Sequence, residues 1–128
     1  MTDVDNEMME GPYPINRVRD YVKQGSIGVY ILGIKNDSTR YVGRSDTDLQ
    51  REIPYRAHRR EYWRGIIYDH FFFKEVGSAL EAYKRECMLW HKYGGEECML
   101  DQYRHPAMPK YSGWRCPIPD CRYHRFGR

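Results

Sequence analysis

The sequence predicts a small α/β domain in which helices flank a three-stranded antiparallel sheet, followed by a cysteine-containing tail. Three observations support this fold class. Two β-rich segments flank turn formers within 27–43, an aromatic run occupies 68–74, and an amphipathic helical pattern covers 79–93. With 128 residues, of which 41% are hydrophobic, the chain can bury the modest core of one domain.

The first predicted element is a β-hairpin that brings two tyrosines together. A turn centred within 35–38 places Tyr30 opposite Gly43. The same register pairs Leu32 with Tyr41. Since strand side chains alternate between two faces, Tyr30 and Tyr41 share a face as diagonal neighbours, roughly 7–8 Å apart at the backbone. The two phenols either belong to one functional site or are an ordinary cross-strand packing pair.

The segment after the hairpin contains a proline that leaves two helix predictions open. Asp48 is a good N-cap for a helix that begins at Leu49, but Pro54 interrupts such a helix. Either the helix is short, or a second helix begins at Pro54 and runs through Arg64. The aromatic run 68–74 then forms the third strand.

A helix is predicted from 79 to 93, because Ser78 and Glu81 form a capping box and a glycine pair follows Tyr93. At 100° per residue, Glu86 falls within the apolar arc of this helix. A carboxylate buried there is costly unless it is paired or holds a cation. Glu86 therefore either has a buried partner such as an arginine or, as we favour, binds a divalent metal ion that faces the two tyrosines.

Cysteines and histidines of this helix and of the tail have the spacing of a metal site. Cys87 and His91 are one helical turn apart, and 116–121 holds two thiols in a proline-rich loop that resembles a zinc knuckle. Disulfides are unusual in an intracellular chain, which favours zinc. Alternatively, Cys87 is a small core residue and the tail thiols are free; His105 or His124 can also replace any proposed ligand. The predicted zinc site, which staples the tail to the helix, consists of Cys87, His91, Cys116 and Cys121.

Basic residues gather in two parts of a chain whose formal net charge is +3. Arginines crowd 51–64 and recur through 104–128, which suits a phosphate backbone but also occurs on solvated helix faces. No segment is long and apolar enough to span a membrane. The acidic N-terminus lacks the apolar run of a secretory signal, so an intracellular, cytoplasmic location is expected.

The chain is predicted to have three parts. Residues 1–24 form a partly flexible N-terminal segment whose first dozen residues fray, 25–103 form the core, and 104–128 form a basic tail packed on that core. No second recognition module is visible, so a homodimer and a separate targeting protein both stay open as partners.

Gly28-Val29-Tyr30 and Tyr41-Val42-Gly43 resemble the two signatures of the GIY-YIG nuclease family, and the resemblance extends over about 27–102. Both glycines lie inside predicted strands, where glycine often marks a bulge or a close approach by another backbone or a ligand. The resemblance implies a hydrolase, an endonuclease that cuts DNA phosphodiester bonds with a tyrosine-activated water. It also implies one divalent cation, Mg²⁺ or Mn²⁺, held by Glu86.

The same resemblance implies roles for individual residues. Tyr41 is the expected general base, Tyr30 orients water or substrate, and Arg51 stabilises the charge that develops on the phosphate. The catalytic residues it implies are Tyr30, Tyr41, Arg51, His58 and Glu86. The substrate-binding residues it implies are Arg44, Tyr55, Arg56 and Gln102, the last near the place of a common family asparagine. Tyr55 and Arg56 stay open as alternates for His58 and Arg51. Tyr55 follows Arg51 by one helical turn, and Arg56 would take the place of Arg51 if the helix begins at Pro54.

Two other classes of function stay open. One is a DNA-binding module that keeps the fold without catalysis, which would bind DNA with a strong salt dependence. The other is a zinc-stabilised interaction domain whose tyrosines serve only in packing.

Overall fold

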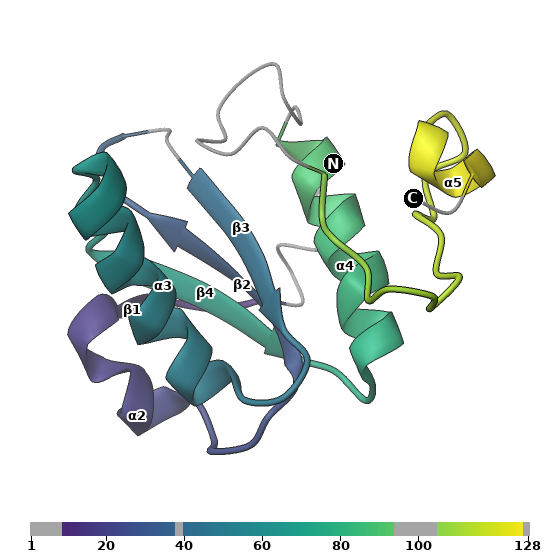
Figure 1. Ribbon diagram of the computed structural model, residues 1–128. Helices are drawn as coiled ribbons and strands as arrows, with labels where there is room; N and C mark the ends of the chain where they lie inside the picture. Colours follow the sequence, from purple (N-terminus) through teal and green to yellow (C-terminus); the bar gives the residue numbers. More distant parts are fainter. Residues whose placement is uncertain (1–8, 38–39, 94–104, 127–128) are drawn as a thin grey trace.

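The computed structural model describes residues 9–37, 40–93 and 105–126 (Figure 1). Its centre is a four-stranded antiparallel sheet with the strand order β1-β4-β2-β3, so β1 and β3 are the two edges. The predicted α/β class, with helices around a small antiparallel sheet, is confirmed. The strands are β1 (Glu10–Pro14), β2 (Gly28–Gly33), β3 (Arg40–Ser45) and β4 (His70–Glu75).

The prediction of three strands was wrong, because β1 forms a fourth strand that begins within the first dozen residues, which were expected to fray. β1 pairs with β4, and Tyr13 lies opposite Phe71. Its composition conceals it, since Pro12 and Pro14 lack the backbone N–H that a central strand needs. An edge strand tolerates proline because half of its N–H groups point away from the sheet.

Helices cover both faces of the sheet (Figure 1). α2 and α3 lie against one face, α4 lies against the other, and the segment that contains α5 lies beyond α4. Among the described residues, no helix combines the length and the apolar character needed to cross a bilayer. The helices are the 3₁₀-helix η1 (Ile15–Arg17), α2 (Val18–Tyr21), α3 (Leu49–Arg64), α4 (Ala79–Lys92) and α5 (Arg122–Phe126).

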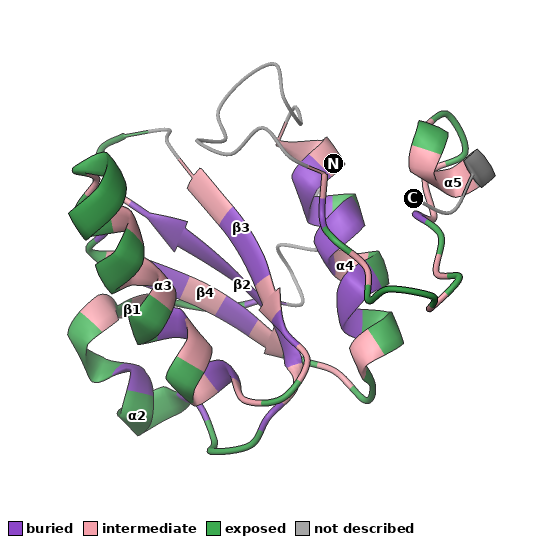
Figure 2. Ribbon diagram, viewed as in Figure 1, coloured by how far each residue is buried: buried purple, intermediate pink, exposed green. Residues whose placement is uncertain are grey.

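The β2–β3 hairpin has the predicted register. Tyr30 lies opposite Gly43, and Leu32 lies opposite Tyr41. Alternate residues of β2 therefore enter different cores: Tyr30 and Leu32 pack with residues of α3, whereas Val29 packs with residues of α4. Figure 2 shows this burial in the strands and along α4, while much of α3 is exposed.

α3 is one continuous helix, so both alternatives for the segment around Pro54 were wrong. Pro54 is its sixth residue and removes the hydrogen bond that an N–H there would donate to Gln50, at a cost of about 3 kcal/mol. Leu49 and Ile53, one turn apart, are fully buried against the sheet. Their burial contributes roughly 3–6 kcal/mol in total, which offsets the cost of the proline.

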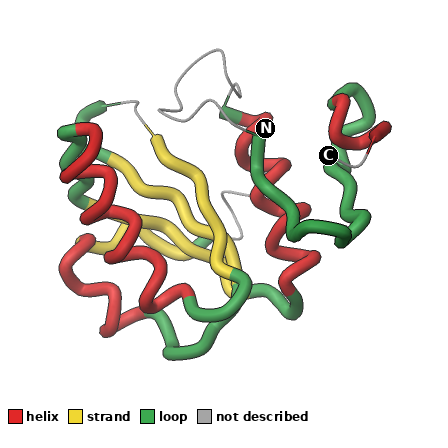
Figure 3. The backbone as a smooth tube through the Cα atoms, in the orientation of Figure 1, coloured by secondary structure: helices red, strands yellow, loops and turns green. Residues whose placement is uncertain are grey.

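The segment from 105 to 126 packs against α4 and forms a small cluster with it (Figure 3). Cys116 is buried there with Tyr83 and Cys87 of α4. The ring of Trp114 covers Tyr83, with the two ring centroids 5.5 Å apart. The C-terminal segment thus adds a further layer outside α4.

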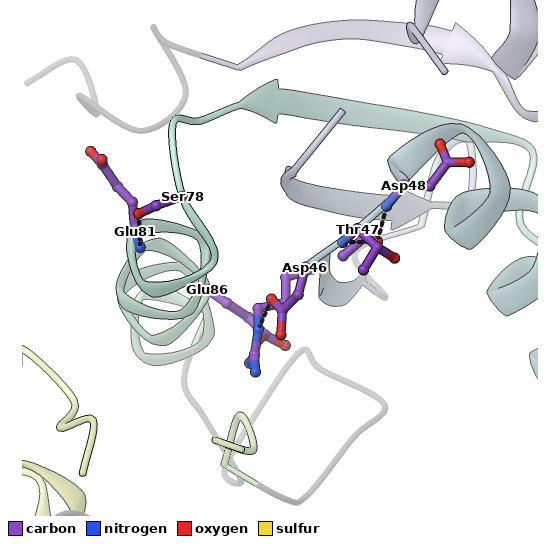
Figure 4. Close-up of polar contacts among 8 residues, drawn as sticks. Asp46, Thr47, Asp48, Ser78, Glu81 and Glu86 are labelled. Atoms are coloured by element: carbon purple, nitrogen blue, oxygen red, sulfur yellow. Dashed lines mark hydrogen bonds and ion pairs between the residues drawn. The ribbon is translucent and has the colours of Figure 1, made fainter. Parts of the chain in front are cut away.

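The prediction for α4 is confirmed to within one residue at its C-terminal end, and the glycine pair at 94–95 lies outside the described residues. Ser78 is the N-cap, and its Oγ accepts a hydrogen bond from the backbone N–H of Glu81 at 3.2 Å (Figure 4). This bond satisfies one of the N–H groups that a helix start leaves without a partner in the helix.

Replacement of the cap by Ser78→Ala is expected to lower the free energy of unfolding by about 1 kcal/mol. Ser78→Asp is the matched control, because its carboxylate can accept the same hydrogen bond and should preserve stability. Urea unfolding followed by circular dichroism measures both. Equal losses in the two variants would contradict the role of the cap.

Candidate active site and metal centre

A cleft of about 520 Å³ opens beside β3, an edge strand of the described sheet, where it meets α3 and α4. Side chains alternate along β3, so Tyr41 reaches the cleft from the face that α3 covers and Arg44 reaches it from the face that α4 covers. An edge strand is required for this arrangement, since a central strand would separate the two faces. The groups that carry chemistry in the lining include Tyr30, Tyr41, Arg44, Arg56, Arg60 and Glu86.

α3 contributes one row of side chains to the cleft. Residues four apart lie along one side of a helix, and the row begins with Glu52. We call the three cationic members, Arg56, Arg60 and Arg64, the arginine row. The buried pair Leu49 and Ile53 fixes which side of α3 faces the sheet and therefore which side faces the cleft.

Tyr30 is anchored to α3 by a hydrogen bond. Its hydroxyl donates to Glu52 Oε2 at 2.7 Å, and Arg56 Nε donates to the same oxygen at 3.3 Å. Gly43 makes room for this contact, because a Cβ at that position would lie 2.4 Å from the Tyr30 hydroxyl oxygen. Burial raises the pKa of Tyr30 well above its ordinary value, so the hydroxyl remains protonated and acts as a donor.

Tyr41 lies beside Tyr30, with the two ring centroids 6.3 Å apart. The guanidinium of Arg60 covers its ring at 4.7 Å from the centroid, within the range of a cation–π contact. Burial raises the pKa of Tyr41, and the positive charges of Arg56 and Arg60 oppose that rise. Arg56 and Arg60 thus supply the charge that favours a phenolate at Tyr41, although its pKa stays above the ordinary value.

Glu86 projects from the middle of α4 and is only 7% exposed. Arg44 Nη1 donates to its Oε1 at 2.6 Å, and Arg44 Nε donates to Asp46 Oδ1 at 2.8 Å. Figure 4 shows Asp46 and Glu86 close together, one after β3 and the other on α4. Of the two alternatives for Glu86, the structure thus contains the buried arginine partner.

Burial raises the pKa of Glu86 to about 7, although the charge of Arg44 opposes this shift. Desolvation outweighs the ion pair because both side chains are largely withdrawn from water. Arg44 itself stays charged: burial acts to lower its pKa, but the contacts with Asp46 and Glu86 together raise it above its ordinary value. A second positive charge near Glu86 would therefore be favourable.

The structure does not bring all of the proposed site residues together. Tyr30, Tyr41, Arg44, Arg56 and Glu86 line the cleft. Arg51, Tyr55 and His58 are exposed on other sides of α3 and do not line it. Arg56, kept open as an alternate, lies where Arg51 was expected, and Gln102 lies outside the described residues.

Glu52, Arg60, Arg64 and Asp46 were not predicted as site residues, although Arg60 and Arg64 belong to the basic stretch 51–64 that suits a phosphate backbone. For the first three, a signal was present: charged residues recur at every fourth position from Glu52 to Arg64, parallel to the apolar pair Leu49 and Ile53. Asp46 follows β3 directly and carries no comparable pattern.

Four side chains from α4 and the C-terminal segment can hold a metal ion. One nitrogen or sulfur atom from each of them lies within 4.8 Å of the others. Burial lowers the pKa of His105 to about 4 and also lowers the pKa of His91, so both imidazoles are neutral at pH 7 and can each offer a lone pair. The four residues are His91, His105, Cys116 and Cys121.

His105 takes the place of Cys87 in this cluster, so the predicted ligand set is wrong at one position. Cys87 and His91 are one helical turn apart, but the Cys87 side chain is fully buried in the cluster with Tyr83 and Cys116. Cys87 is thus a small core residue, as the alternative had it. His124, the other alternate, uses its Nδ1 in a hydrogen bond with the carbonyl oxygen of Cys116 at 2.7 Å.

The cleft and the metal cluster have different chemistry. Carboxylates and guanidinium groups at the cleft suit hard cations and phosphate, whereas sulfur and imidazole in the cluster suit softer ions. No protein-family model, curated protein or solved structure that was compared with the chain matches it.

The pKa of Glu86 makes stability depend on pH. Because its folded pKa of about 7 exceeds the ordinary 4.5, its contribution is fully present below pH 4.5 and is lost as pH rises through 7. Glu86→Gln has no carboxyl group to ionise at this position, so the variant does not lose this stability as pH rises. The stability of the variant relative to the parent should therefore increase between about pH 5 and pH 8.

Urea unfolding at several pH values measures this change. Glu81→Gln is the matched control, since Glu81 is an exposed carboxylate on the same helix. If the stability difference between Glu86→Gln and the parent stayed constant across the pH range, the pKa of Glu86 would not be raised in the folded state.

Proposed function

We propose that this protein is a metal-dependent endonuclease that hydrolyses phosphodiester bonds of DNA. One observation supports this most strongly: the buried carboxylate of Glu86 lines the same cleft as two adjacent tyrosines and a row of arginines. Hydrolysis of a phosphodiester needs cations that stabilise negative charge on the phosphate and a base that deprotonates the attacking water. The cleft contains groups suited to both tasks.

Substrate binding in this proposal falls to the arginine row. Its three guanidinium groups lie along the cleft wall that α3 provides, and guanidinium binds phosphate through paired hydrogen bonds. Arg56 also contacts Glu52, which fixes its orientation in the cleft. The row stabilises the extra negative charge that develops on the phosphate during hydrolysis.

Tyr41 is the proposed general base. It lies between Tyr30 and the guanidinium of Arg60, and the arginines oppose the rise that burial causes in its pKa. Tyr30 donates to Glu52 and is thus suited to positioning. A free phenol titrates near pH 10, so Tyr41 also depends on the nearby cations to accept a proton.

The chemistry of the cleft fits a hard divalent cation. Mg²⁺ and Mn²⁺ take oxygen ligands, and Glu86 and Asp46 offer carboxylates there, both fixed by Arg44. When bound, the ion would neutralise charge on the leaving oxygen. Glu86 is the proposed ligand because desolvation keeps its negative charge costly even beside Arg44.

Nicking of supercoiled plasmid tests the nuclease proposal. The parent should nick with Mg²⁺ and stop nicking with EDTA. Glu86→Gln and Tyr41→Phe should each reduce the rate by about 100-fold or more, because one removes the cation ligand and the other the base. Glu81→Gln should keep the parent rate.

Metal-dependent nicking that survives Glu86→Gln would refute the site. Salt-dependent DNA binding without any nicking would favour the catalytically inactive DNA-binding module.

We also infer that the His91, His105, Cys116 and Cys121 cluster holds a structural zinc ion. A tetrahedral zinc site has ligands at about 2.0–2.3 Å, which places neighbouring ligand atoms roughly 3.3–3.8 Å apart. Cys116 Sγ and His91 Nε2 are 3.6 Å apart. The ion would join the C-terminal segment to α4, and reduced cysteine ligands fit the cytoplasm.

Metal analysis of protein purified without chelator tests the zinc assignment. The parent should contain about one zinc ion per chain, and His105→Ala and Cys116→Ser should contain much less. Cys87→Ala should retain the ion, because Cys87 is outside the cluster. Loss of zinc from Cys87→Ala with retention in His105→Ala would restore the ligand set expected from helical spacing.

A further inference from the structure

The outward side of α3 carries a second row of side chains that the nuclease proposal does not use. Tyr55, Arg59 and Trp63 follow one another at intervals of four residues, about 100° around the helix from the arginine row. Tyr62 meets the ring of Trp63 edge-on, with the ring centroids 4.9 Å apart. We call Tyr55, Arg59, Tyr62 and Trp63 the aromatic row.

The three rings of the aromatic row are large and exposed. Tyr55 is 50% exposed, Trp63 65% and Tyr62 73%. The guanidinium of Arg59 lies between two of these rings, 5.7 Å from the centroid of Tyr55 and 5.8 Å from that of Trp63. The result is a surface on which flat apolar faces alternate with positive charge.

The aromatic row is continuous with the cleft. Arg56, a member of the arginine row, lies 5.6 Å from the ring centroid of Tyr55, so one residue joins the two rows. A strand whose phosphates followed the arginine row would therefore pass beside the aromatic row.

We propose that the aromatic row stacks on unpaired bases of a DNA strand whose phosphates lie along the arginine row. Bases in a duplex are paired and already stacked, whereas unpaired bases can leave the stack and lie on aromatic rings. The positive charge of Arg59 is complementary to the negative charge of a DNA strand. This inference rests on the proposed nuclease function and specifies its substrate class, which is DNA with a single-stranded segment beside the cleaved bond.

Oligonucleotide binding in EDTA tests the proposal independently of cleavage. The probes are a fluorescent oligodeoxythymidine of roughly 20 nucleotides and a blunt duplex of the same length. The parent should bind the single strand more tightly than the duplex. Trp63→Ala should weaken single-strand binding by about tenfold or more and duplex binding by less than about twofold.

Two further variants complete the design. Trp63→Phe should retain most of the single-strand binding, because it keeps an aromatic ring. Tyr111→Ala is the matched control, since Tyr111 is exposed beside a cation, Lys110, but lies in the C-terminal segment and should leave binding unchanged. Circular dichroism verifies that each variant is folded.

Equal losses on both probes, or no loss in Trp63→Ala, would overturn the aromatic row as a base-stacking surface. Plasmid nicking together with either result would leave the nuclease proposal standing. Selective loss of single-strand binding in a protein that never nicks would uphold the aromatic row and refute the nuclease.

Discussion

The register of β2 against β3 determines which side of the sheet each group in the cleft comes from. Tyr30 lies opposite Gly43, so the Tyr30 hydroxyl passes over a position without a side chain and reaches Glu52. One residue further along β3, Arg44 points to the other face and meets Glu86. A slip of one residue would exchange these faces and separate every pair. Both the core and the cleft therefore depend on this one pairing.

Local sequence patterns were enough to predict the elements whose structure is determined by residues close together in the chain. The hairpin follows from its turn and strand composition, and α4 follows from Ser78 and an apolar periodicity. β1 was missed because its strand character comes from pairing with β4 rather than from its own residues. α3 was divided at Pro54 because local propensity favoured a break, whereas tertiary burial of Leu49 and Ile53 holds the helix together.

The errors in the candidate site have a similar origin. Arg51 and Arg56 are five residues apart, which is about 140° around a helix, so they project from different sides of α3 and only Arg56 faces the cleft. At the metal cluster, the helical spacing of Cys87 and His91 is real, but Cys87 is buried in the core with Tyr83 and is not one of the four grouped ligands. The position of His105 depends on how the C-terminal segment returns to α4, which spacing along the chain does not encode.

The contact between Arg44 and Glu86 also gives the cleft an internal competitor for metal. In the proposed nuclease, the divalent ion would have to bind a carboxylate that already faces a guanidinium, rather than enter an empty negative site. The apparent metal affinity is then reduced by the free energy of the contact that is replaced. Such a site would favour divalent over monovalent ions, since a monovalent ion carries the same charge as the guanidinium and gains little by replacing it. A divalent ion would therefore need a higher concentration to fill this site than to fill one without the guanidinium.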